Sequence, residues 1–254
     1  MKGAYDPIKR TKTLEKYAFS GENRAYYRFR PAKWYGGIVT GDVTVCNLLC
    51  RFCWAGDDIR HHPQNVGKFY TPEKAFKRLC SIGEKKGYRL MRLSGQEPTI
   101  GREHLLRLLK LVGKTRYRFI LETNGILIGH EKDYADCLSE FNNLHVRVSL
   151  KGTNEGEFSA LTGAKPEFFP LQSKSLENLV KSGVSCHPSV MVSFSETENV
   201  RKLQERLAAI APFLKEEMEI EELILYPHVV KRLKKMDMDY SIGHDPGCVP
   251  KELV

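Results

Sequence analysis

The chain alternates short runs of β-branched, aliphatic and aromatic residues with longer stretches in which apolar residues recur every three or four positions. Short apolar runs bounded by turn residues indicate strands, and the longer period indicates helices with one buried face. Six strands are predicted, over residues 38–45, 88–94, 118–122, 144–150, 185–194 and 220–226. Strands that alternate with helices along a chain are typical of βα units and a parallel sheet.

The predicted helices carry the expected end signals. The helix over residues 72–86 has Thr71 as its N-cap and Pro72 at its first position, and it stops at Gly87. The helix over residues 102–112 places four apolar residues on one face, Leu105, Leu108, Leu109 and Val112. Further helices are predicted over residues 131–141, 172–181 and 198–211. One face of each would pack on the sheet.

Six βα units fit either an open doubly wound sheet or a partial (β/α)6 TIM-like barrel. In both architectures the chemistry collects at the carboxyl ends of the strands. The repeated units occupy residues 38–230. Residues 1–37 are polar and aromatic-rich without a clear period and are predicted to form an N-terminal extension, and residues 231–254 are predicted to form a C-terminal tail.

Composition places the chain among globular proteins. It has 254 residues, of which 41% are apolar and 28% charged, and it shows no repeat and no low-complexity tract. No apolar run approaches the ~20 residues of a membrane span, and the start of the chain lacks the apolar core of a signal peptide. These features predict a soluble, cytoplasmic protein that does not bind membranes.

The net charge of +9 and the seven cysteines add two weaker constraints. Surplus lysine and arginine most often form a solvated surface, although a nucleic acid or another acidic partner is the alternative. The basic run at residues 231–235 is interpreted as solvated helix surface, as a docking site for an acidic partner or as a phosphate-binding patch, and solvated helix surface is favoured. An odd number of cysteines without an export signal favours reduced thiols that serve metal binding or catalysis.

Three of the cysteines, Cys46, Cys50 and Cys53, lie close together in the run TVCNLLCRFCWAG, directly after the first predicted strand. One loop can bring three thiolates to one inorganic centre at this C-x3-C-x2-C spacing, and thiolates hold iron–sulfur clusters or zinc. A closed zinc site uses four protein ligands, which disfavours zinc because the other cysteines are scattered singly: Cys80, Cys137, Cys186 and Cys248. A [4Fe–4S] cluster on three cysteines leaves one iron open to an outside ligand.

With Phe52 as its aromatic residue, the C-x3-C-x-aromatic-C run resembles the signature of the radical S-adenosylmethionine (SAM) superfamily. The resemblance implies a partial barrel over residues 38–230, a [4Fe–4S] cluster on the three cysteines, and SAM bound to the open iron through its amino and carboxylate groups. It also implies reductive cleavage of SAM to a 5′-deoxyadenosyl radical that abstracts hydrogen from a substrate.

The end of the second predicted strand supports the resemblance. It reads Ser-Gly-Gln-Glu-Pro over residues 94–98, where the superfamily usually has Gly-Gly-Glu. The resemblance implies that Gly95, Gln96 and Glu97 receive the SAM amino group. Because Gln96 replaces a glycine that allows close backbone approach, its side chain either points away from the ligand or alters the contact. An ordinary strand-to-helix turn is the alternative.

Later strand ends resemble pyruvate formate-lyase activating enzyme and its relatives. The third predicted strand ends in Glu-Thr-Asn-Gly, and the resemblance implies that Glu122 and Asn124 face SAM. The fourth ends in Ser149, Leu150 and Lys151, where Ser149 replaces an aspartate and the lysine would lie near the SAM carboxylate or ribose. A hairpin turn and a surface lysine are the respective alternatives.

The sixth predicted strand ends in Tyr-Pro-His, a transposed form of the Pro-Tyr-His of glycyl-radical activating enzymes, and the resemblance implies that His228 reaches SAM. A turn or surface histidine is the alternative. Four residues before the cysteine loop could line the substrate mouth, although a packed N-terminal lid is the favoured use of their aromatic rings: Arg30, Lys33, Trp34 and Tyr35. No catalytic role is assigned to them.

The resemblance therefore favours an activating enzyme that acts on a protein substrate and takes electrons from a ferredoxin or flavodoxin type donor. Two alternatives stay open. One is a radical SAM enzyme that modifies RNA or a metabolite, for which the net charge is the only support. The other is a non-catalytic iron–sulfur or zinc-binding module.

Overall fold

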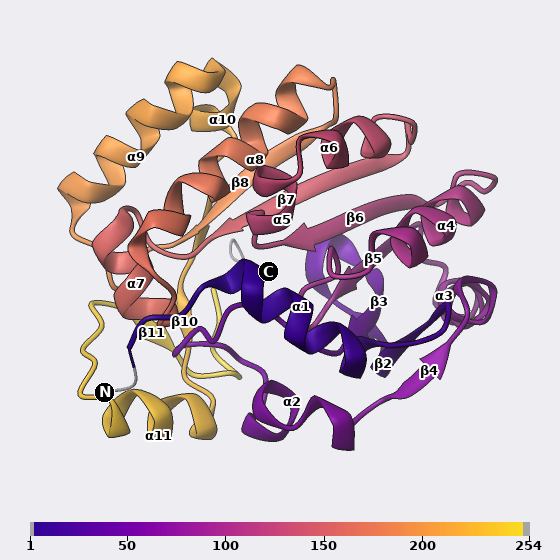
Figure 1. Ribbon diagram of the computed structural model, residues 1–254, viewed down its shortest axis with the longest axis horizontal. Coiled ribbons are helices and arrows are strands. Elements are labelled where there is room, and N and C mark those ends of the chain that lie inside the picture. Colours follow the sequence, from indigo (N-terminus) through magenta and orange to yellow (C-terminus); the bar gives the residue numbers. More distant parts are fainter. Residues whose placement is uncertain (1–2, 251–254) are drawn as a thin grey trace.

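The computed structural model describes residues 3–250 (Figure 1); residues 1–2 and 251–254, at the ends of the predicted extension and tail, lie outside the described part. Within residues 3–250, nine strands form one sheet in the order β1-β2-β3-β5-β6-β7-β8-β9, with β4 beside β2. The strands are β1 Phe19–Ser20, β2 Asn23–Ala32, β3 Ile38–Val43, β4 Lys68–Tyr70, β5 Leu90–Ser94, β6 Arg118–Thr123, β7 Leu144–Leu150, β8 Cys186–Met191 and β9 Glu219–Glu221. The strands from β3 to β9 run parallel.

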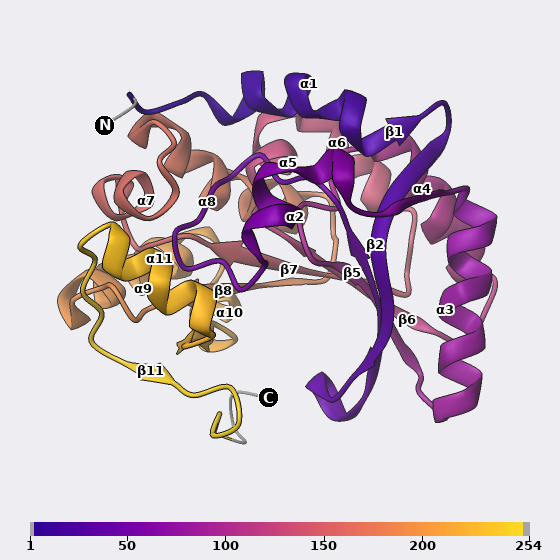
Figure 2. The ribbon, with the colours of Figure 1, turned by 90° about the horizontal axis from the view of Figure 1, so that it is seen from below.

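The α-helices are α1 Pro7–Ala18, α2 Asp57–His61, α3 Pro72–Lys86, α4 Arg102–Val112, α5 Ile126–His130, α6 Lys132–Leu138, α7 Glu155–Thr162, α8 Phe169–Lys181, α9 Thr197–Ile210, α10 Pro212–Glu216 and α11 Pro227–Lys235. The helices from α3 to α10 lie between consecutive parallel strands and cover the outer face of the curved sheet, whereas α1 precedes β1 and α11 follows β10 (Leu223–Ile224) (Figure 1). Figure 2 shows α1 along one side of the molecule, where it contacts α5. The predicted partial (β/α)6 barrel is confirmed.

The local end signals of the helices work as predicted. The Thr71 hydroxyl accepts a hydrogen bond from the Lys74 amide at 3.1 Å, which satisfies one of the free amides of the first turn of α3. Gly87 ends that helix at φ 67°, a left-handed conformation that glycine adopts without steric cost. None of the helices in residues 3–250 is both long enough and apolar enough to cross a membrane.

The parallel strands carry two different faces. Alternate residues such as Met91, Phe119 and Val146 are buried in the apolar core that the helices cover. Most of the intervening residues toward the carboxyl ends of these strands are polar, and Arg92 and Arg147 belong to this second set. Because side chains alternate along a strand, the polar set converges inside the barrel. The strands therefore build a charged interior behind an apolar shell.

Residues 1–37 contain elements that the sequence pattern does not reveal. Strand β2 runs antiparallel to β3 in the same sheet, with Arg28 opposite Asp42 and Ala32 opposite Ile38. The pairing register shifts between Tyr26 and Arg28, as in a β-bulge. A bulge interrupts the two-residue alternation that marks a strand, which explains why no period was visible.

Two predicted strands end differently in the structure. The segment 220–226 splits into β9 and β10 (Leu223–Ile224), and β10 pairs with β11 (Gly243–His244) instead of the main sheet. Where the chain leaves the main sheet, the Leu223 amide donates to the Ser193 hydroxyl at 2.8 Å. Strand β8 ends at Met191, whereas the strand predicted from the sequence extends over residues 185–194. The chain forms a turn at Ser193 and Phe194. Helix α11 spans the predicted boundary between residues 230 and 231.

Candidate functional site

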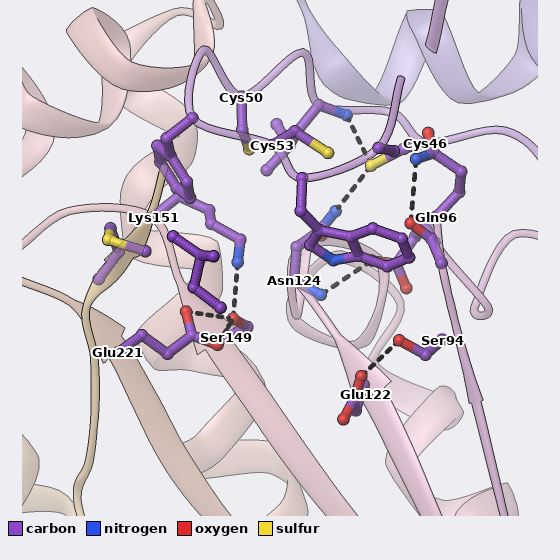
Figure 3. A pocket seen from close by; sticks show the side chains of 18 of the residues that line it. Cys46, Cys50, Cys53, Ser94, Gln96, Glu122, Asn124, Ser149, Lys151 and Glu221 are labelled. Carbon is purple, nitrogen blue, oxygen red and sulfur yellow. Dashed lines mark hydrogen bonds between the residues drawn. The ribbon is translucent and has the colours of Figure 1, made fainter. Parts of the chain in front are cut away.

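A pocket of about 610 Å³ lies at the carboxyl ends of the parallel strands. Figure 3 shows that its lining side chains come from the cysteine loop and from several strand ends. Every site residue predicted from the sequence lines it: Cys46, Cys50, Phe52, Cys53, Gly95, Gln96, Glu97, Glu122, Asn124, Ser149, Lys151 and His228. The structure thus brings these residues together, while their individual roles stay predictions.

The cysteine loop leaves β3 through a constrained backbone. Val45 has φ 62°, which is rare for a β-branched residue, and Cys46 follows it directly. The Cys53 amide donates to the Cys50 carbonyl at 3.1 Å, and the Leu48 amide lies 3.4 Å from the Cys46 sulfur. All three cysteines are free thiols. The loop therefore has a defined shape without a disulfide.

Two buried arginines, which we call the arginine clamp, hold the carbonyl groups of this loop. Arg60 of α2 donates to the Leu49 carbonyl at 3.1 Å and the Cys50 carbonyl at 2.9 Å. Arg232 of α11 donates to the Cys53 carbonyl at 2.7 Å, and it also pairs with Asp57. These charged hydrogen bonds satisfy the carbonyls and fix the shape of the loop that carries the thiols.

Arg232 corrects the expectation of a solvated helix surface at residues 231–235. Three lysines of this run are exposed, Lys231, Lys234 and Lys235, but Arg232 and Leu233 are buried. The helix is amphipathic, so its buried face packs on the molecule and delivers the guanidinium to the cysteine loop. His228 at the start of the same helix donates to the Trp54 carbonyl at 2.7 Å.

The turn at residues 94–98 is tightly packed. Gly95 has φ 93°, and a Cβ there would lie 2.8 Å from the Tyr27 hydroxyl and 2.9 Å from the Asp42 Cβ, so a larger residue would clash. The Gln96 side-chain amide donates to the Gly95 carbonyl at 3.0 Å and so folds back on its own turn. The sequence alone left open where this side chain points.

Glu97 is almost completely buried, with 1% of its surface exposed. Its Oε1 accepts from the Thr99 hydroxyl and the Thr123 hydroxyl, both at 2.6 Å, and its Oε2 accepts from the Asn124 amide at 2.8 Å. The carboxylate thus ties the turn after β5 to the end of β6. Oε2 has the greater remaining capacity to accept a ligand donor.

The wall of the pocket at the end of β7 is a charged network, and we call its four side chains the β7–β9 wall: Arg147, Lys151, Glu219 and Glu221. Arg147 donates to Glu219 at 2.6 Å and to Glu221 at 2.7 Å. The Lys151 ammonium donates to the Ser149 hydroxyl at 2.6 Å, and Ser149 in turn contacts Glu221 (Figure 3). Two cations therefore face two carboxylates.

These contacts decide the ionisation of the wall. Burial opposes ionisation of Glu219, but hydrogen bonds from Arg147 and His187 outweigh it and lower the pKa of Glu219 to about 2. Burial also opposes ionisation of Glu122, yet the nearby Arg92 and Arg147 guanidinium groups lower the pKa of that carboxyl. Both carboxylates are therefore charged at neutral pH.

The sequence pattern missed several lining residues, including Arg28, Arg92, Arg147 and Glu219. The sequence could have indicated two of them, because Arg92 and Arg147 interrupt the apolar runs LMRLS and LHVRVSL. An arginine within a buried strand is almost never without a charged or polar partner. Of the four residues considered for the substrate mouth, the structure places three in the pocket lining, Arg30, Trp34 and Tyr35, and leaves Lys33 outside it.

The family model of the radical SAM superfamily matches residues 42–207, well over half of the chain. The chain belongs to the radical SAM superfamily. Members of this superfamily use a [4Fe–4S] cluster and SAM, and the matched residues include the cysteine loop and the ends of the strands from β3 to β8.

Among curated radical SAM relatives, a probable GTP 3′,8-cyclase of Sulfurisphaera tokodaii is 32% identical over 122 residues, which cover 47% of this chain and 35% of the relative. The structure of Streptococcus suis SuiB bound to S-adenosylmethionine matches with a TM-score of 0.59 and 16% identity, over 76% of this chain and 44% of SuiB. The structure of anSMEcpe with bound AdoMet matches with a TM-score of 0.53 and 24% identity, over 72% and 48%.

The chain spans about a third of the cyclase and less than half of SuiB. At these identities the solved structures show the shared fold of the radical SAM barrel. The activities and substrates in their names belong to those proteins.

The residues of the cysteine loop fit a radical SAM cluster. Asn47 follows Cys46, is fully buried, and its Nδ2 has no hydrogen-bond partner within residues 3–250. The Asn124 side-chain amide lies 3.8 Å from the Cys46 sulfur. Burial raises the pKa of Cys50 to about 11, so a bound cation is needed to stabilise the thiolate.

The three thiols all line the same pocket. Within the described residues, no three His, Cys, Asp or Glu side chains converge closely enough to hold one metal ion. A [4Fe–4S] cluster does not require such convergence, because each thiolate binds a different iron. Cys46, Cys50 and Cys53 could therefore hold the cluster on one face of the pocket.

Proposed function

We propose that this radical SAM protein cleaves SAM reductively and abstracts hydrogen from a substrate that enters the pocket beside the cysteine loop. The observation that carries the proposal is the convergence of the three free thiols and all predicted SAM contacts on one pocket. When bound, the cluster and SAM supply a one-electron cleavage of a carbon–sulfur bond, which yields a 5′-deoxyadenosyl radical. The protein supplies binding, orientation and exclusion of water.

The cysteine loop would hold the cluster through Cys46, Cys50 and Cys53. The arginine clamp fixes the loop by donating hydrogen bonds to its carbonyl groups. The side-chain amide of Asn124, which lines the pocket, lies 3.8 Å from the Cys46 sulfur. Thiolate hydrogen bonding and burial tune cluster potentials, so these groups would set how easily the electron arrives.

SAM would be oriented by the strand ends that face the loop. Oε2 of Glu97 can accept a hydrogen bond from the SAM amino group, and Asn124 lies between Glu97 and the Cys46 sulfur. Lys151 can pair with the SAM carboxylate or donate to the ribose. Its side chain is within reach of the pocket while Ser149 holds it at 2.6 Å.

For the substrate, the activating-enzyme type is supported by the strand-end motifs that line the pocket. Glu122, Asn124 and Lys151 carry the resemblance to activating enzymes, Ser149 stands where those enzymes have an aspartate, and all four line the same pocket. The solved relatives SuiB and anSMEcpe have been captured with the peptides SuiA and Cp18Cys, respectively. A peptide segment of a protein partner is therefore one substrate to test, with a ferredoxin or flavodoxin type electron donor.

The test of the proposal is anaerobic reconstitution with iron and sulfide, followed by dithionite and SAM, with 5′-deoxyadenosine measured as product. Cys46→Ala, Cys50→Ala and Cys53→Ala are each expected to lose the cluster absorbance and at least about a hundredfold of product formation. Cys80→Ala is the matched control because Cys80 is a free cysteine on α3 that does not line the pocket. A cluster that forms in the wild-type protein without cleaving SAM would contradict the proposal and favour a non-catalytic iron–sulfur module.

The role of Glu97 has its own prediction. Glu97→Gln keeps the side-chain shape but removes the negative charge, and a charged hydrogen bond contributes about 1.5–3 kcal/mol, so SAM affinity is expected to fall roughly tenfold or more. Cluster content should stay unchanged. Equilibrium binding of SAM to the reconstituted protein measures the effect, and Glu84→Gln on the exposed end of α3 is the control. Equal SAM affinity in both variants would assign Glu97 to packing alone.

A further inference from the structure

A pair of arginines stands at the edge of the pocket on β2, the strand that the sequence pattern does not reveal. The shift in pairing after Tyr26 places Tyr26 and Phe29 together on one side, where their rings stack at 4.9 Å. Arg28 and Arg30 lie on the other side and line the pocket. The bulge is therefore what turns both guanidinium groups toward the site.

One carboxylate holds both arginines. Arg28 Nε donates to Asp42 Oδ2 at 2.6 Å, and Arg30 Nε donates to the same oxygen at 2.8 Å. The Asp42 side chain is fully buried, while the side chains of Arg28 and Arg30 keep 44% and 23% exposure. Both arginines use mainly Nε for Asp42, so terminal NH groups of each stay available to a ligand. We call these three residues the β2–β3 wall.

The ratio of guanidinium groups to carboxylates distinguishes the β2–β3 wall from the rest of the pocket. Arg92 pairs with Glu122, and the β7–β9 wall sets two cations against two carboxylates. In the β2–β3 wall two guanidinium groups share one carboxylate, and no second carboxylate pairs with either of them among residues 3–250. Like charges held together are unfavourable unless an anion compensates them. One positive charge is left for a ligand.

Two aromatic residues complete the surroundings of the pair. The Trp54 ring, next to the last cysteine of the loop, lies 5.8 Å from the Arg28 guanidinium carbon and 5.9 Å from that of Arg30. Tyr27 also lines the pocket, and its hydroxyl is buried without a hydrogen-bond partner in the described part of the chain. The wall thus offers guanidinium donors, a hydroxyl donor and a flat ring beside the cysteine loop.

We propose that Arg28 and Arg30 bind an anionic group of the substrate, a phosphate or a carboxylate. Guanidinium groups recognise both because their paired NH donors match two oxygens of either anion. The inference rests on the proposed function, since it names the substrate chemistry of the same pocket. Asp42 positions the pair through Nε and so presents the terminal donors to the anion.

The experiment measures anion binding directly, on cluster-loaded protein with saturating SAM and at constant ionic strength. Equilibrium dialysis with labelled inorganic phosphate reports the phosphate arm, and labelled malonate reports the carboxylate arm. The wild-type protein should bind at least one of the two probes. The arm with higher affinity identifies which anion the substrate carries. Failure of both probes to bind overturns the proposal.

Single substitutions test whether Arg28 and Arg30 bind the anion. Each leaves the other arginine paired with Asp42. Arg28→Gln and Arg30→Gln are each expected to weaken binding about tenfold or more, because each removes a charged donor. Arg30→Lys keeps the positive charge but lacks the paired donors, so its affinity for the anion should lie between that of the wild-type protein and that of Arg30→Gln. Arg201→Gln on the exposed face of α9 is the matched control and should bind like the wild-type protein. Unchanged affinity in both glutamine variants also overturns the proposal.

Three further outcomes keep this inference separate from the proposed function. If the probe binds only without SAM and is displaced by SAM, the pair belongs to the SAM carboxylate, and the substrate assignment is wrong. If the protein produces 5′-deoxyadenosine but binds neither probe, only the anion site fails. If it binds a probe through the pair but never cleaves SAM, the anion site stands and the proposed function fails.

Discussion

The β2–β3 wall and the β7–β9 wall face the same pocket, yet they use arginine in opposite ways. The Arg147 side chain is 9% exposed and forms ion pairs with two carboxylates, so its charge is neutralised within the protein. Arg28 and Arg30 share Asp42 and keep exposed terminal donors. The number of carboxylates beside an arginine, more than its presence in a pocket, decides whether it can serve a ligand.

The different burial of the two walls predicts that substitutions in them have different effects on the stability of the fold. A buried charge that loses its partner costs free energy because it was removed from water without compensation. Removing Arg147 would leave Glu219 and Glu221 without their shared guanidinium partner, whereas removing Arg30 leaves Asp42 paired with Arg28. Changes in the two walls should therefore have very different effects on folding.

The largest expected effect is that of Arg147→Met. Met keeps much of the side-chain volume but leaves Glu219 and Glu221 without their shared cation, so the free energy of unfolding should fall by about 3 kcal/mol, the lower end for a broken buried pair because Glu219 is partly solvated. Urea denaturation measures the change, with Arg201→Met as the surface control. A loss below about 1 kcal/mol would mean that water already compensates this wall.

Glu219→Gln should have an intermediate, pH-dependent effect. The pKa of Glu219 is lowered to about 2 in the folded protein, so its ionised form stabilises the fold above the pKa of about 4.3 that a glutamate has in an unfolded chain. The variant should be less stable by about 1 kcal/mol at pH 7, since the side chain is partly exposed. The difference should shrink as the pH falls from about 4.3 toward 2.

Denaturation at several pH values between 7 and 2.5 checks this sign. The groups that face Glu219 are Arg147, His187 and Glu221. A difference between wild-type and variant that stays constant over the whole range would show that the lost stability comes from packing and hydrogen-bond shape, without a contribution from the charge.

The smallest expected effect on stability is that of Arg30→Met. One like-charged neighbour is removed and Asp42 keeps its 2.6 Å contact with Arg28, so the free energy of unfolding should change by less than about 1 kcal/mol. The same urea titration measures it beside Arg147→Met. A loss as large as that of Arg147→Met would make the pair a structural element of the β2–β3 wall and remove the contrast between the two walls.

Much of the site could be predicted from contiguous residues. The spacing of Cys46, Cys50 and Cys53 fixes a loop that can present three thiols, and the strand-end positions of Gly95, Glu122 and Lys151 follow from the alternation of strands and helices. Parallel strands end at one edge, so residues at their carboxyl ends must meet. The structure places all of these residues in one pocket for that reason.

Other features depend on contacts between distant segments. Arg232 binds the Cys53 carbonyl across 179 positions of the chain, and nothing in the local run of lysines distinguishes it from its solvated neighbours. The side chains of β2 face the pocket because of a bulge that erases the strand pattern. The sequence by itself determined the loop, the order of the strands and the family, since these follow from short-range spacing. Only the tertiary structure decided which arginines are neutralised, because that depends on how many carboxylates the folded chain brings beside each one.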